Sequence, residues 1–443
     1  MKKIAPISGF PEWLPEQRLV ELRVIDLIRE QFELFGFAPV ETRSVESLDV
    51  LLKKGETDKE IYVLRRLQAE EHEANKEVGL PFDLTVPFSR YVAQYRGQLT
   101  FPFKRYQIQK VWRGERPKEG RFREFYQADV DVIAENSLPL SFDIELPRML
   151  HVVLSALPIP PVRILINNRK LLQGAYESLG IADTTSVLRI VDKLDKIGDA
   201  GVAELLRSQL ALKASQSDAI LAIAKIQSAD ASFAERLLAL GLQGRLLDEG
   251  INELTMVMDG LQDLPRSLIL ADLHIARGLD YYTGTVYEGV MLGHEQMGAV
   301  CSGGRYDTLI ASDSVQLPGI GVSIGISRIL GRLFGQGQLA SSRKTPTCVL
   351  VAVGTEAQRE QAVAIANLLR ARGVPTEVYH ESVKFDKQIR YATRKGIPFV
   401  WFVEGHVSGT NEVRDLRTGA QITVDPATWM PPEEDRRPRI VIP

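Results

Sequence analysis

The stretch 103–131 holds the residues whose types and spacing best suit chemistry. It reads FKRYQIQKVWRGERPKEGRFREFYQADVD, in which a run of alternating residues is followed by a polar turn and a second alternating run. This pattern predicts a β-hairpin, with Arg113 at the end of the first strand and with Arg121 and Arg123 on the returning strand. Arginines on both strands beside carboxylates suit an anionic ligand that also has donors to read, such as a phosphate with a base attached.

These arginines could instead be solvated surface charge, which is the usual fate of arginine. Their number and the interleaved Phe125 and Gln127 favour a site. A cationic clamp on phosphoryl oxygens is a standard way to stabilise phosphoryl rearrangement. An aromatic face such as Phe125 can stack a purine, and Glu115 could accept from an adenine amino group. The hairpin therefore predicts a nucleotide or phosphate site, with the surface interpretation left open.

A second constellation is ARGLDYYTGTVYE at 276–288, where Arg277 precedes the paired tyrosines Tyr281 and Tyr282. Two adjacent tyrosines are usually one core and one surface residue, and a buried tyrosine hydroxyl prefers a partner. The functional interpretation is a pocket in which tyrosine hydroxyls and carboxylates read a small, polar, aromatic ligand. Both interpretations stay open on the pattern alone.

Two further motifs are shorter. In PFDLTVPFSRY (81–91), Asp83 and Thr85 could cap a helix, or they could present a carboxylate and a hydroxyl to an ammonium group. In CSGGRYD and PGIGVSIGISR, the glycines could permit tight strand packing, and Arg328 could reach a phosphate. Neither GxGxxG nor GxxxxGK[ST] occurs in the required context, and no GxSxG is present. The six histidines show no metal-ligand spacing, so no bound metal is predicted.

Length and composition set the class of protein. The 443 residues suffice for two or three domains, and the net charge of -3 gives no global basic signal. Cys301 and Cys348 are the only cysteines, which fits a reducing cytosol. The N-terminus lacks the apolar segment of a signal peptide, and no run approaches 18 apolar residues. A cytoplasmic protein is expected.

The elements predict two domains. Helical spacing occupies 16–35, and strands recur up to 335 around a helix-rich insertion at 169–262. The domain borders are predicted as follows: 1–335, a sheet-based domain; 336–346, a polar linker; 347–426, a small α/β domain with parallel pairing; 427–443, a Pro-rich and loosely held tail. The basic helix at 384–396 could be a solvated face or could suit a phosphate backbone.

Together these segments resemble the histidyl-tRNA synthetases, which are class II aminoacyl-tRNA synthetases. The hairpin resembles motif 2 of the class, GIGVSIGISR resembles motif 3, and ARGLDYYTG resembles a signature peptide specific to the histidine enzymes. The resemblance runs from about residue 5 to about residue 425. It implies an α+β fold, with an antiparallel-sheet catalytic domain that carries a helical insertion and with a small α/β anticodon-binding domain after it.

The resemblance also implies an activity and its residues. The enzyme would activate L-histidine with ATP to histidyl-adenylate and pyrophosphate, then transfer histidine to the 3′-terminal adenosine of tRNA(His). Arg113 and Arg277 would be catalytic, by holding the α-phosphate. ATP would be bound by Arg113, Glu115, Arg121, Arg123, Phe125 and Arg328. Histidine would be bound by Asp83, Leu84, Thr85, Arg113, Gln127, Asp131, Arg277, Tyr281 and Tyr282. Mg²⁺ is expected with ATP, and the resemblance implies a homodimer.

One departure and two rivals accompany the resemblance. Motif 1, which builds the dimer interface of the class, usually ends in a proline where this chain has Arg43. The closest rival is a catalytically silent paralogue that serves as the regulatory subunit of ATP phosphoribosyltransferase. Such paralogues typically lack the C-terminal domain and erode the signature peptide, and both are present here. The second rival, an adenylate-forming enzyme that charges a metabolite or protein, would not need the 347–425 domain.

Overall fold

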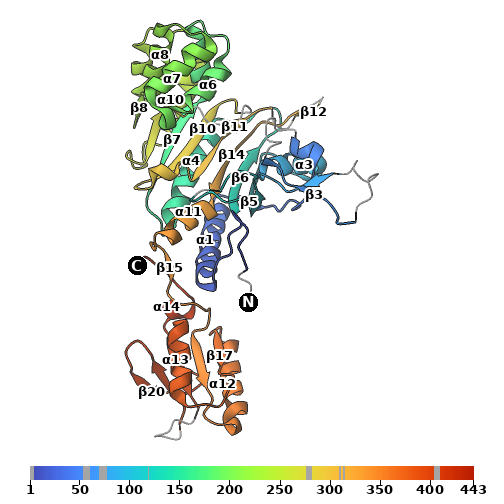
Figure 1. Cartoon of the computed structure of the whole chain (residues 1–443), viewed down its shortest axis with the longest axis vertical. Helices are drawn as coiled ribbons and strands as arrows, with labels where there is room; N and C mark the ends of the chain where they lie inside the picture. Colours follow the sequence, from blue (N-terminus) through green and yellow to red (C-terminus); the bar gives the residue numbers. More distant parts are fainter. Residues whose placement is uncertain are drawn as a thin grey trace. The chain divides into compact units, whose positions relative to one another are not determined.

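The computed structural model describes residues 4–52, 60–68, 77–117, 119–275, 282–308, 311–312, 315–403 and 410–443. The chain forms two compact units. The first unit is Met1–Pro11 with Ile25–Gly331, and the second is Glu12–Val24 with Arg332–Pro443. Helices and mixed sheets make up both units, so the fold is α+β (Figure 1).

A nine-stranded sheet is the centre of the first unit. Its strands lie in the order β1 (Ala38–Pro39), β5 (Phe103–Trp112), β6 (Glu124–Ile133), β14 (Gly319–Gly325), β11 (Cys301–Tyr306), β10 (Thr285–Met291), β7 (Val162–Asn168), β9 (Ile269–Asp272) and β8 (Gln227–Ser228). Neighbours are antiparallel except β1 with β5 and β7 with β9.

The predicted hairpin is confirmed as the antiparallel pair β5 and β6. One detail of the prediction was wrong: the returning strand begins at Glu124, so that Arg121 and Arg123 precede it. The physical reason is a contact with the N-terminal segment, since the backbone N–H of Arg123 donates to the carbonyl of Gly9 at 2.7 Å. The two arginines therefore belong to the loop that joins the strands.

Strand β6 is buried on both faces, and the two faces differ in character. Ala128, Val130 and Val132 alternate on one face and are fully buried. Gln127, Asp129 and Asp131 alternate on the other face and are also buried, although they are polar. Register places these three opposite polar residues of β5, in the pairs Gln109↔Gln127, Gln107↔Asp129 and Arg105↔Asp131.

Shorter elements surround this sheet. Helix α4 (Ser141–Ala156) contacts β7 and β14. Other elements along this part of the chain include α2 (Leu48–Leu51), α3 (Thr85–Tyr95), and the small sheet of β2 (Glu46–Ser47), β4 (Val78–Gly79) and β3 (Val63–Leu64). Helices α1 (Pro15–Leu34) and α11 (Ile326–Gly335) each belong partly to the first unit and partly to the second. Helix α1 confirms the prediction made at 16–35. Among the described helices, none has the length and apolar character needed to cross a bilayer.

The predicted helical insertion is confirmed. Its helices are α5 (Arg169–Ser178), α6 (Thr184–Val191), α7 (Leu194–Leu210), α8 (Ala214–Ala224), α9 (Phe233–Leu238) and α10 (Arg245–Asp259). Helices α5 and α10 approach closely, as Gly174 shows: a Cβ there would lie 2.3 Å from the Leu247 nitrogen.

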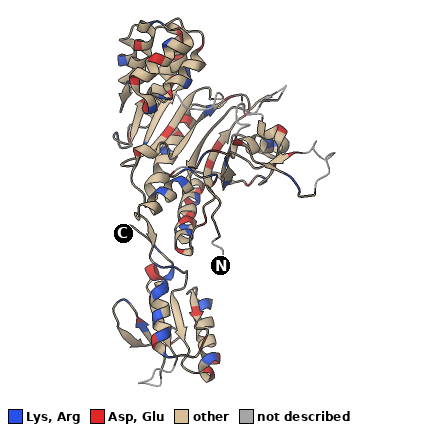
Figure 2. Ribbon diagram, viewed as in Figure 1, with Lys and Arg blue, Asp and Glu red and all other residues tan. Residues whose placement is uncertain are grey.

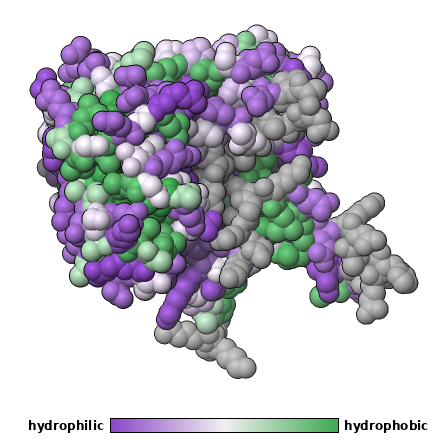
Figure 3. Space-filling model, turned by 90° about the horizontal axis from the view of Figure 1, so that it is seen from above, coloured by the Kyte–Doolittle hydropathy of each residue, from purple (hydrophilic) through white to green (hydrophobic). Residues whose placement is uncertain are grey.

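Seen from above, green apolar patches lie among purple polar residues on the surface of the molecule (Figure 3), which is ordinary for a protein surface.

The second unit holds a five-stranded sheet in the order β17 (Thr376–Val378), β16 (Val349–Ala352), β18 (Phe399–Phe402), β19 (Glu412–Asp415) and β20 (Gln421–Thr423). The predicted parallel pairing holds for the first three strands, whereas β19 and β20 add an antiparallel edge that the sequence pattern did not predict. Helices α12 (Arg359–Ala371) and α13 (Phe385–Lys395) pack on this sheet. Lysines and arginines recur along α13, and both acidic and basic residues occur on the other elements (Figure 2).

The prediction of a loosely held tail was wrong. Strand β15 (Ala340–Ser341), in the predicted linker, pairs with β21 (Ile440–Val441), in the predicted tail. Arg343 is buried, and its guanidinium donates to the carbonyl oxygens of Asp435 at 2.6 Å and Arg436 at 3.1 Å. Both carbonyls belong to helix α14 (Glu433–Arg436). A buried arginine therefore fixes the C-terminal segment, despite its proline-rich composition.

Candidate functional site

Two adjoining cavities open on the polar face of β6. The first has a volume of about 270 Å³ and the second about 300 Å³. They share six lining residues: Arg113, Glu115, Gln127, Tyr282, Ser302 and Ser323. Most of the described residues that were expected to bind ATP or histidine thus lie around two adjoining cavities, and Arg113 and Gln127 line both of them.

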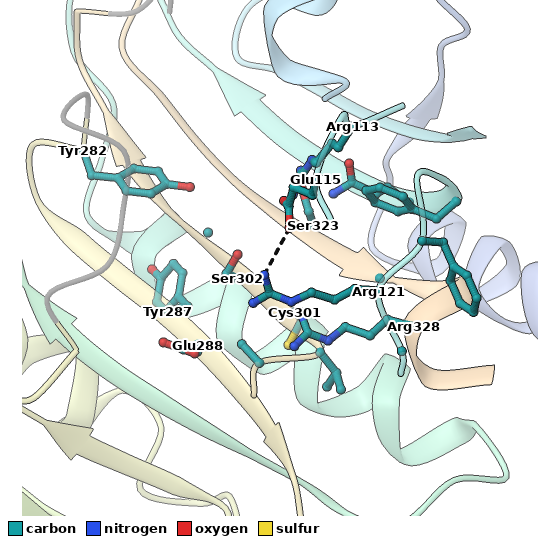
Figure 4. Close-up of a pocket in the computed structure, with 18 residues that line it drawn as sticks. Arg113, Glu115, Arg121, Tyr282, Tyr287, Glu288, Cys301, Ser302, Ser323 and Arg328 are labelled. Carbon is teal, nitrogen blue, oxygen red and sulfur yellow. Dashed lines mark hydrogen bonds and ion pairs between the residues drawn. The ribbon is translucent and has the colours of Figure 1, made fainter. Parts of the chain in front are cut away.

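The first cavity contains four of the residues expected to bind ATP besides Arg113. These are Glu115, Arg121, Phe125 and Arg328. Glu115 accepts from Arg121 Nη1 at 3.1 Å, which is the dashed line in Figure 4. In the same view Arg121 and Arg328 extend across the cavity toward the side where Tyr287 and Glu288 lie. Two guanidinium groups on one side of a cavity suit a ligand with several phosphates.

Arg113 is held in a defined orientation between the two cavities. Its Nε donates to the carbonyl oxygen of Phe82 at 3.0 Å, and its Nη1 lies 3.9 Å from Glu115 Oε1. Its guanidinium carbon lies 5.2 Å from the centroid of the Phe125 ring, within cation–π range. An arginine oriented from three directions can meet a negative group without first being ordered.

Arg123 does not line either cavity. Its Nε donates to the backbone carbonyl of Glu115 at 3.1 Å, and its Nη1 reaches the carbonyl of Ser8 at 3.5 Å. Gly9 packs against this side chain so closely that a Cβ there would lie 2.8 Å from Arg123 Cγ. Of the two distal arginines considered from sequence, Arg121 is the one that the structure brings to the cavity.

The second cavity contains Asp83 and Thr85, at the start of α3. Asp83 Oδ1 accepts from the Val86 N–H at 3.0 Å, so Asp83 also satisfies a free donor of the helix. Leu84 between them does not line the cavity; it is buried, and its carbonyl accepts from Arg105 at 3.4 Å. The capping and binding interpretations of Asp83 are therefore compatible.

Asp131 lines the second cavity and is tied down by two partners. Its Oδ2 lies 2.5 Å from Arg105, and its Oδ1 accepts from the Tyr306 hydroxyl at 2.6 Å. Gly321, opposite Asp131 on β14, leaves room for this carboxylate, since a Cβ there would lie 2.1 Å from Oδ1. Tyr306 also lines the cavity. It was not selected from sequence, although it stands in the CSGGRYD motif.

Asp129, between Gln127 and Asp131 on the same face, is the lining residue that sequence reasoning missed most clearly. Burial raises the pKa of its carboxyl to about 7, Arg105 opposes that rise, and the nearby Asp131 adds to it. The strict alternation Gln127, Asp129, Asp131 was the signal that could have found it. Glu60 also lines this cavity, and burial together with Glu115 raises the pKa of its carboxyl.

Tyr282 lines both cavities. Arg277 and Tyr281 lie outside the described residues, so their assigned roles stay predictions. Within the part of the chain that the structure describes, no group of three or more His, Cys, Asp or Glu side chains is arranged to hold a metal ion.

Two family models match this chain. Residues 9–329 match the family described as histidyl-tRNA synthetase, and residues 347–429 match the family described as anticodon binding domain. The first match covers the hairpin, both cavities and the helical insertion. The second covers the five-stranded sheet of the second unit together with α12 and α13.

Individual proteins agree with these matches. Histidine–tRNA ligase from Thermobifida fusca (strain YX) is 53% identical over 427 residues, which is 96% of this chain and 97% of that protein. Histidine–tRNA ligase from Micrococcus luteus is 48% identical over 99% of both chains. The crystal structure of histidyl-tRNA synthetase from Nostoc sp. PCC 7120 superposes with a TM-score of 0.86 at 34% identity, covering 96% of this chain and 97% of that one. The chain therefore belongs to the histidyl-tRNA synthetase family.

Proposed function

We propose that this chain is a histidine–tRNA ligase that forms histidyl-adenylate from L-histidine and ATP and then passes histidine to the 3′-terminal adenosine of tRNA(His). One observation carries the proposal: the cavity lined by Arg121, Phe125 and Arg328 adjoins the cavity lined by Asp83 and Asp131. Two substrates that must react with each other need adjoining sites. The family membership gives the reaction class.

The first step needs positioning rather than a protein nucleophile. The carboxylate of histidine attacks the α-phosphorus of ATP, and pyrophosphate leaves. Arg113 stands on the division between the cavities, so it would meet both the attacking carboxylate and the α-phosphate. Catalysis then comes from fixed geometry and from cations placed where charge develops.

ATP would occupy the first cavity. Arg121 and Arg328 would bind the outer phosphates, Glu115 would accept from the adenine amino group, and Phe125 would stack on the ring. Mg²⁺ would enter with ATP, held by phosphate oxygens, which is how this ion is commonly bound in nucleotide sites.

Histidine would occupy the second cavity. Asp83, Thr85 and Gln127 would meet its ammonium group, and Asp131 with Tyr282 would read the imidazole. Asp131 is held in place by Arg105 and Tyr306 before any ligand binds. A wrong amino acid that cannot pair with these buried polar groups would be strongly disfavoured.

The C-terminal unit would bind the tRNA. Helix α13 presents Lys387, Arg390 and Arg394 along its length, and such a helix suits a phosphate backbone. This unit also argues against the regulatory-subunit alternative. A structure titled as an ATP phosphoribosyltransferase regulatory subunit/histidyl-tRNA synthetase has a TM-score of 0.72 at 20% identity, a likeness that concerns the fold alone. We also propose that the chain works as a homodimer in the cytoplasm.

Amino-acid-dependent exchange of pyrophosphate into ATP tests the first step. We expect exchange with L-histidine and with no other standard amino acid. Exchange supported by another amino acid and not by histidine would refute the assigned specificity. Arg277→Ala should keep the fold, measured by thermal unfolding, and abolish exchange; near-normal rates in that variant would remove Arg277 from the mechanism.

Charge reversal on α13 tests the second step. The double substitution Lys387→Glu with Arg394→Glu should leave pyrophosphate exchange unchanged and should weaken tRNA charging, because the reversed charges repel phosphates. The loss should become smaller as salt is added, since salt screens the interaction. Unchanged charging at low salt would contradict the role of α13.

A further inference from the structure

The buried carboxylate of Asp129 has no hydrogen-bond partner among the residues that the structure describes, whereas buried polar groups in proteins are almost always paired. Asp129 is 1% exposed, and among the described residues neither of its oxygens has a hydrogen-bond partner. Its cross-strand neighbours are Gln107 on β5 and Ser323 on β14. An unpaired buried carboxylate is costly, so it is retained for a reason other than stability.

Neither neighbour supplies the missing donor. The Gln107 amide nitrogen donates to Thr42 Oγ1 at 2.9 Å and to Gln109 Oε1 at 2.5 Å, which uses both of its hydrogens. The Ser323 hydroxyl is close enough to lower the pKa of Asp129, but it makes no hydrogen bond of acceptable geometry with it. The strands that flank Asp129 therefore leave its oxygens available.

The adjacent acceptor on the same face has the same deficit. The amide oxygen of Gln127 is buried, and none of the described residues donates to it. Gln127 and Asp129 both line the second cavity. Two residues that line a hollow of about 300 Å³ thus carry three acceptor oxygens, one from Gln127 and two from Asp129, to which no described residue donates. A ligand suited to this arrangement carries N–H donors, and a positive charge would add to its affinity.

The surroundings of Asp129 are mixed in charge. Arg105 on β5 faces it and favours its anionic form, whereas Asp131 on β6 and Asp83 before α3 disfavour that form. Tyr306 on β11 and Tyr282 line the same cavity. Arg105 is already paired with Asp131 at 2.5 Å. Five carboxylates line the cavity (Glu60, Asp83, Glu115, Asp129 and Asp131) against one lining arginine, Arg113, so negative charge is in surplus there.

We infer that Asp129 is a substrate-binding residue that accepts an N–H of the bound amino acid, beside the residues already assigned to that task. The inference rests on the proposed function, because it takes histidine as the occupant of the second cavity. Histidine offers two sources of such a donor: its ammonium group and its imidazole ring. Both have the required chemistry, and the experiment separates them.

The test is calorimetric titration of L-histidine into the full-length protein near pH 8. Asp129→Asn keeps the size of the side chain but replaces one acceptor with donors, which would face the donors of the substrate. We expect the Kd for histidine to rise about 10- to 100-fold, as for a lost hydrogen bond to a charged group. The Kd for ATP should change by less than about threefold.

Asp272→Asn is the matched control. Asp272 is a buried aspartate of the same unit, it does not line either cavity, and its oxygens accept from Gln227 and from the His274 N–H. Its loss should leave the Kd for histidine within about threefold of the unsubstituted protein. Asp129→Ala, titrated in parallel, gives the same test if the asparagine variant does not fold.

Imidazolepropionate, which lacks the ammonium group, identifies the donor. If Asp129→Asn weakens histidine and imidazolepropionate equally, the imidazole N–H is the partner. If it weakens histidine alone, the ammonium group is the partner. The ratio of the two histidine Kd values, variant to unsubstituted, should also shrink from near pH 8 to near pH 6, because a protonated aspartic acid resembles asparagine.

A histidine Kd within about threefold of the unsubstituted protein, in folded Asp129→Asn and Asp129→Ala, would overturn the inference. Failure of the proposed function gives a different result. In that case the unsubstituted protein itself shows no histidine-dependent pyrophosphate exchange, whatever the variants do.

Discussion

Two buried aspartates of the first unit, Asp143 and Asp129, are in opposite situations. Asp143, in the first turn of α4, accepts hydrogen bonds from Arg305. The Nε of Arg305 donates to both carboxylate oxygens at 3.2 Å, and its Nη2 donates to Oδ2 at 2.5 Å. Arg305 also donates to the carbonyl of Leu138 at 3.1 Å. Asp129, in the middle of β6, has no hydrogen bond from any described residue. The Asp143 carboxylate is saturated, because donors reach both of its oxygens. The Asp129 carboxylate is open, because no described residue donates to it.

The difference teaches how to separate architecture from function among buried charges. Burial raises the pKa of both carboxyl groups, and the Arg305 guanidinium opposes the rise at Asp143. The Asp143 carboxylate is held by Arg305, which is itself fixed by the Leu138 carbonyl, and this is what a structural ion pair requires. Asp129 lines a cavity beside Gln127, whose amide oxygen likewise accepts from none of the described residues. Four predictions test this distinction, from the largest effect to the smallest.

Breaking the saturated pair should have the largest effect. Arg305→Met leaves Asp143 buried without its cation, and we expect a loss of about 3–5 kcal/mol in the free energy of unfolding. Urea unfolding near pH 7 measures it. A loss below about 1 kcal/mol would mean that this pair behaves like an exposed one, and the distinction would fail.

Removing the open carboxylate of Asp129 should instead raise the free energy of unfolding. The folded-state pKa of Asp129 is raised to about 7 from 3.8, so folding favours the protonated form, and stability is lost as pH rises from about 4 to about 7. Asp129→Asn does not titrate. Its gain in unfolding free energy should therefore grow across that window and level off at roughly 2–4 kcal/mol above it. Unfolding measured at several pH values shows this, and a gain independent of pH would contradict it.

Removing one hydrogen bond to Asp131 should lower stability by an intermediate amount. Tyr306→Phe removes the hydroxyl that donates to Asp131 Oδ1 but leaves the Arg105 contact in place. We expect a loss of about 1–2 kcal/mol in stability. The KM for histidine in pyrophosphate exchange should rise more than the KM for ATP. Equal changes in the two constants would indicate a general disturbance rather than a specific one.

A half-exposed pair should give the smallest effect. In the C-terminal unit, Lys395 lies 2.9 Å from Glu377, and both side chains are about 30% exposed. Lys395→Met should lower stability by at most about 1 kcal/mol and should leave pyrophosphate exchange unchanged. A loss as large as that of Arg305→Met would show that burial does not set the scale.

Much of this arrangement could be predicted from local pattern. The hairpin, the helical insertion and the strand before α11 follow from periodicity that the sequence shows directly. Arg113, Arg121, Arg328 and Tyr282 were selected by type and spacing, and the structure places them around the cavities. Such features depend on neighbours along the chain, which is why the sequence reveals them.

The remainder depends on pairing across the sheet. Tyr306 meets Asp131 although the two are 175 residues apart, and no local pattern reveals that partnership. The open state of Asp129 follows from what Gln107 and Ser323 do on the flanking strands. The paired C-terminal strand β21 was missed for the same reason, since its partner β15 lies far back along the sequence and its own segment is proline-rich. The antiparallel edge β19–β20 was missed although its strands pair with segments close in sequence.

The burial of Arg343 has a practical consequence for work at the bench. Arg343 is 4% exposed, and its guanidinium depends on backbone oxygens of Asp435 and Arg436. A chain shortened to end at Pro431 would leave this cation buried without those acceptors, and the C-terminal unit would lose stability. An affinity tag appended after Pro443, where the side chains are exposed, leaves those acceptors in place. Tags therefore belong beyond the last residue, and trimming of this proline-rich end should be avoided.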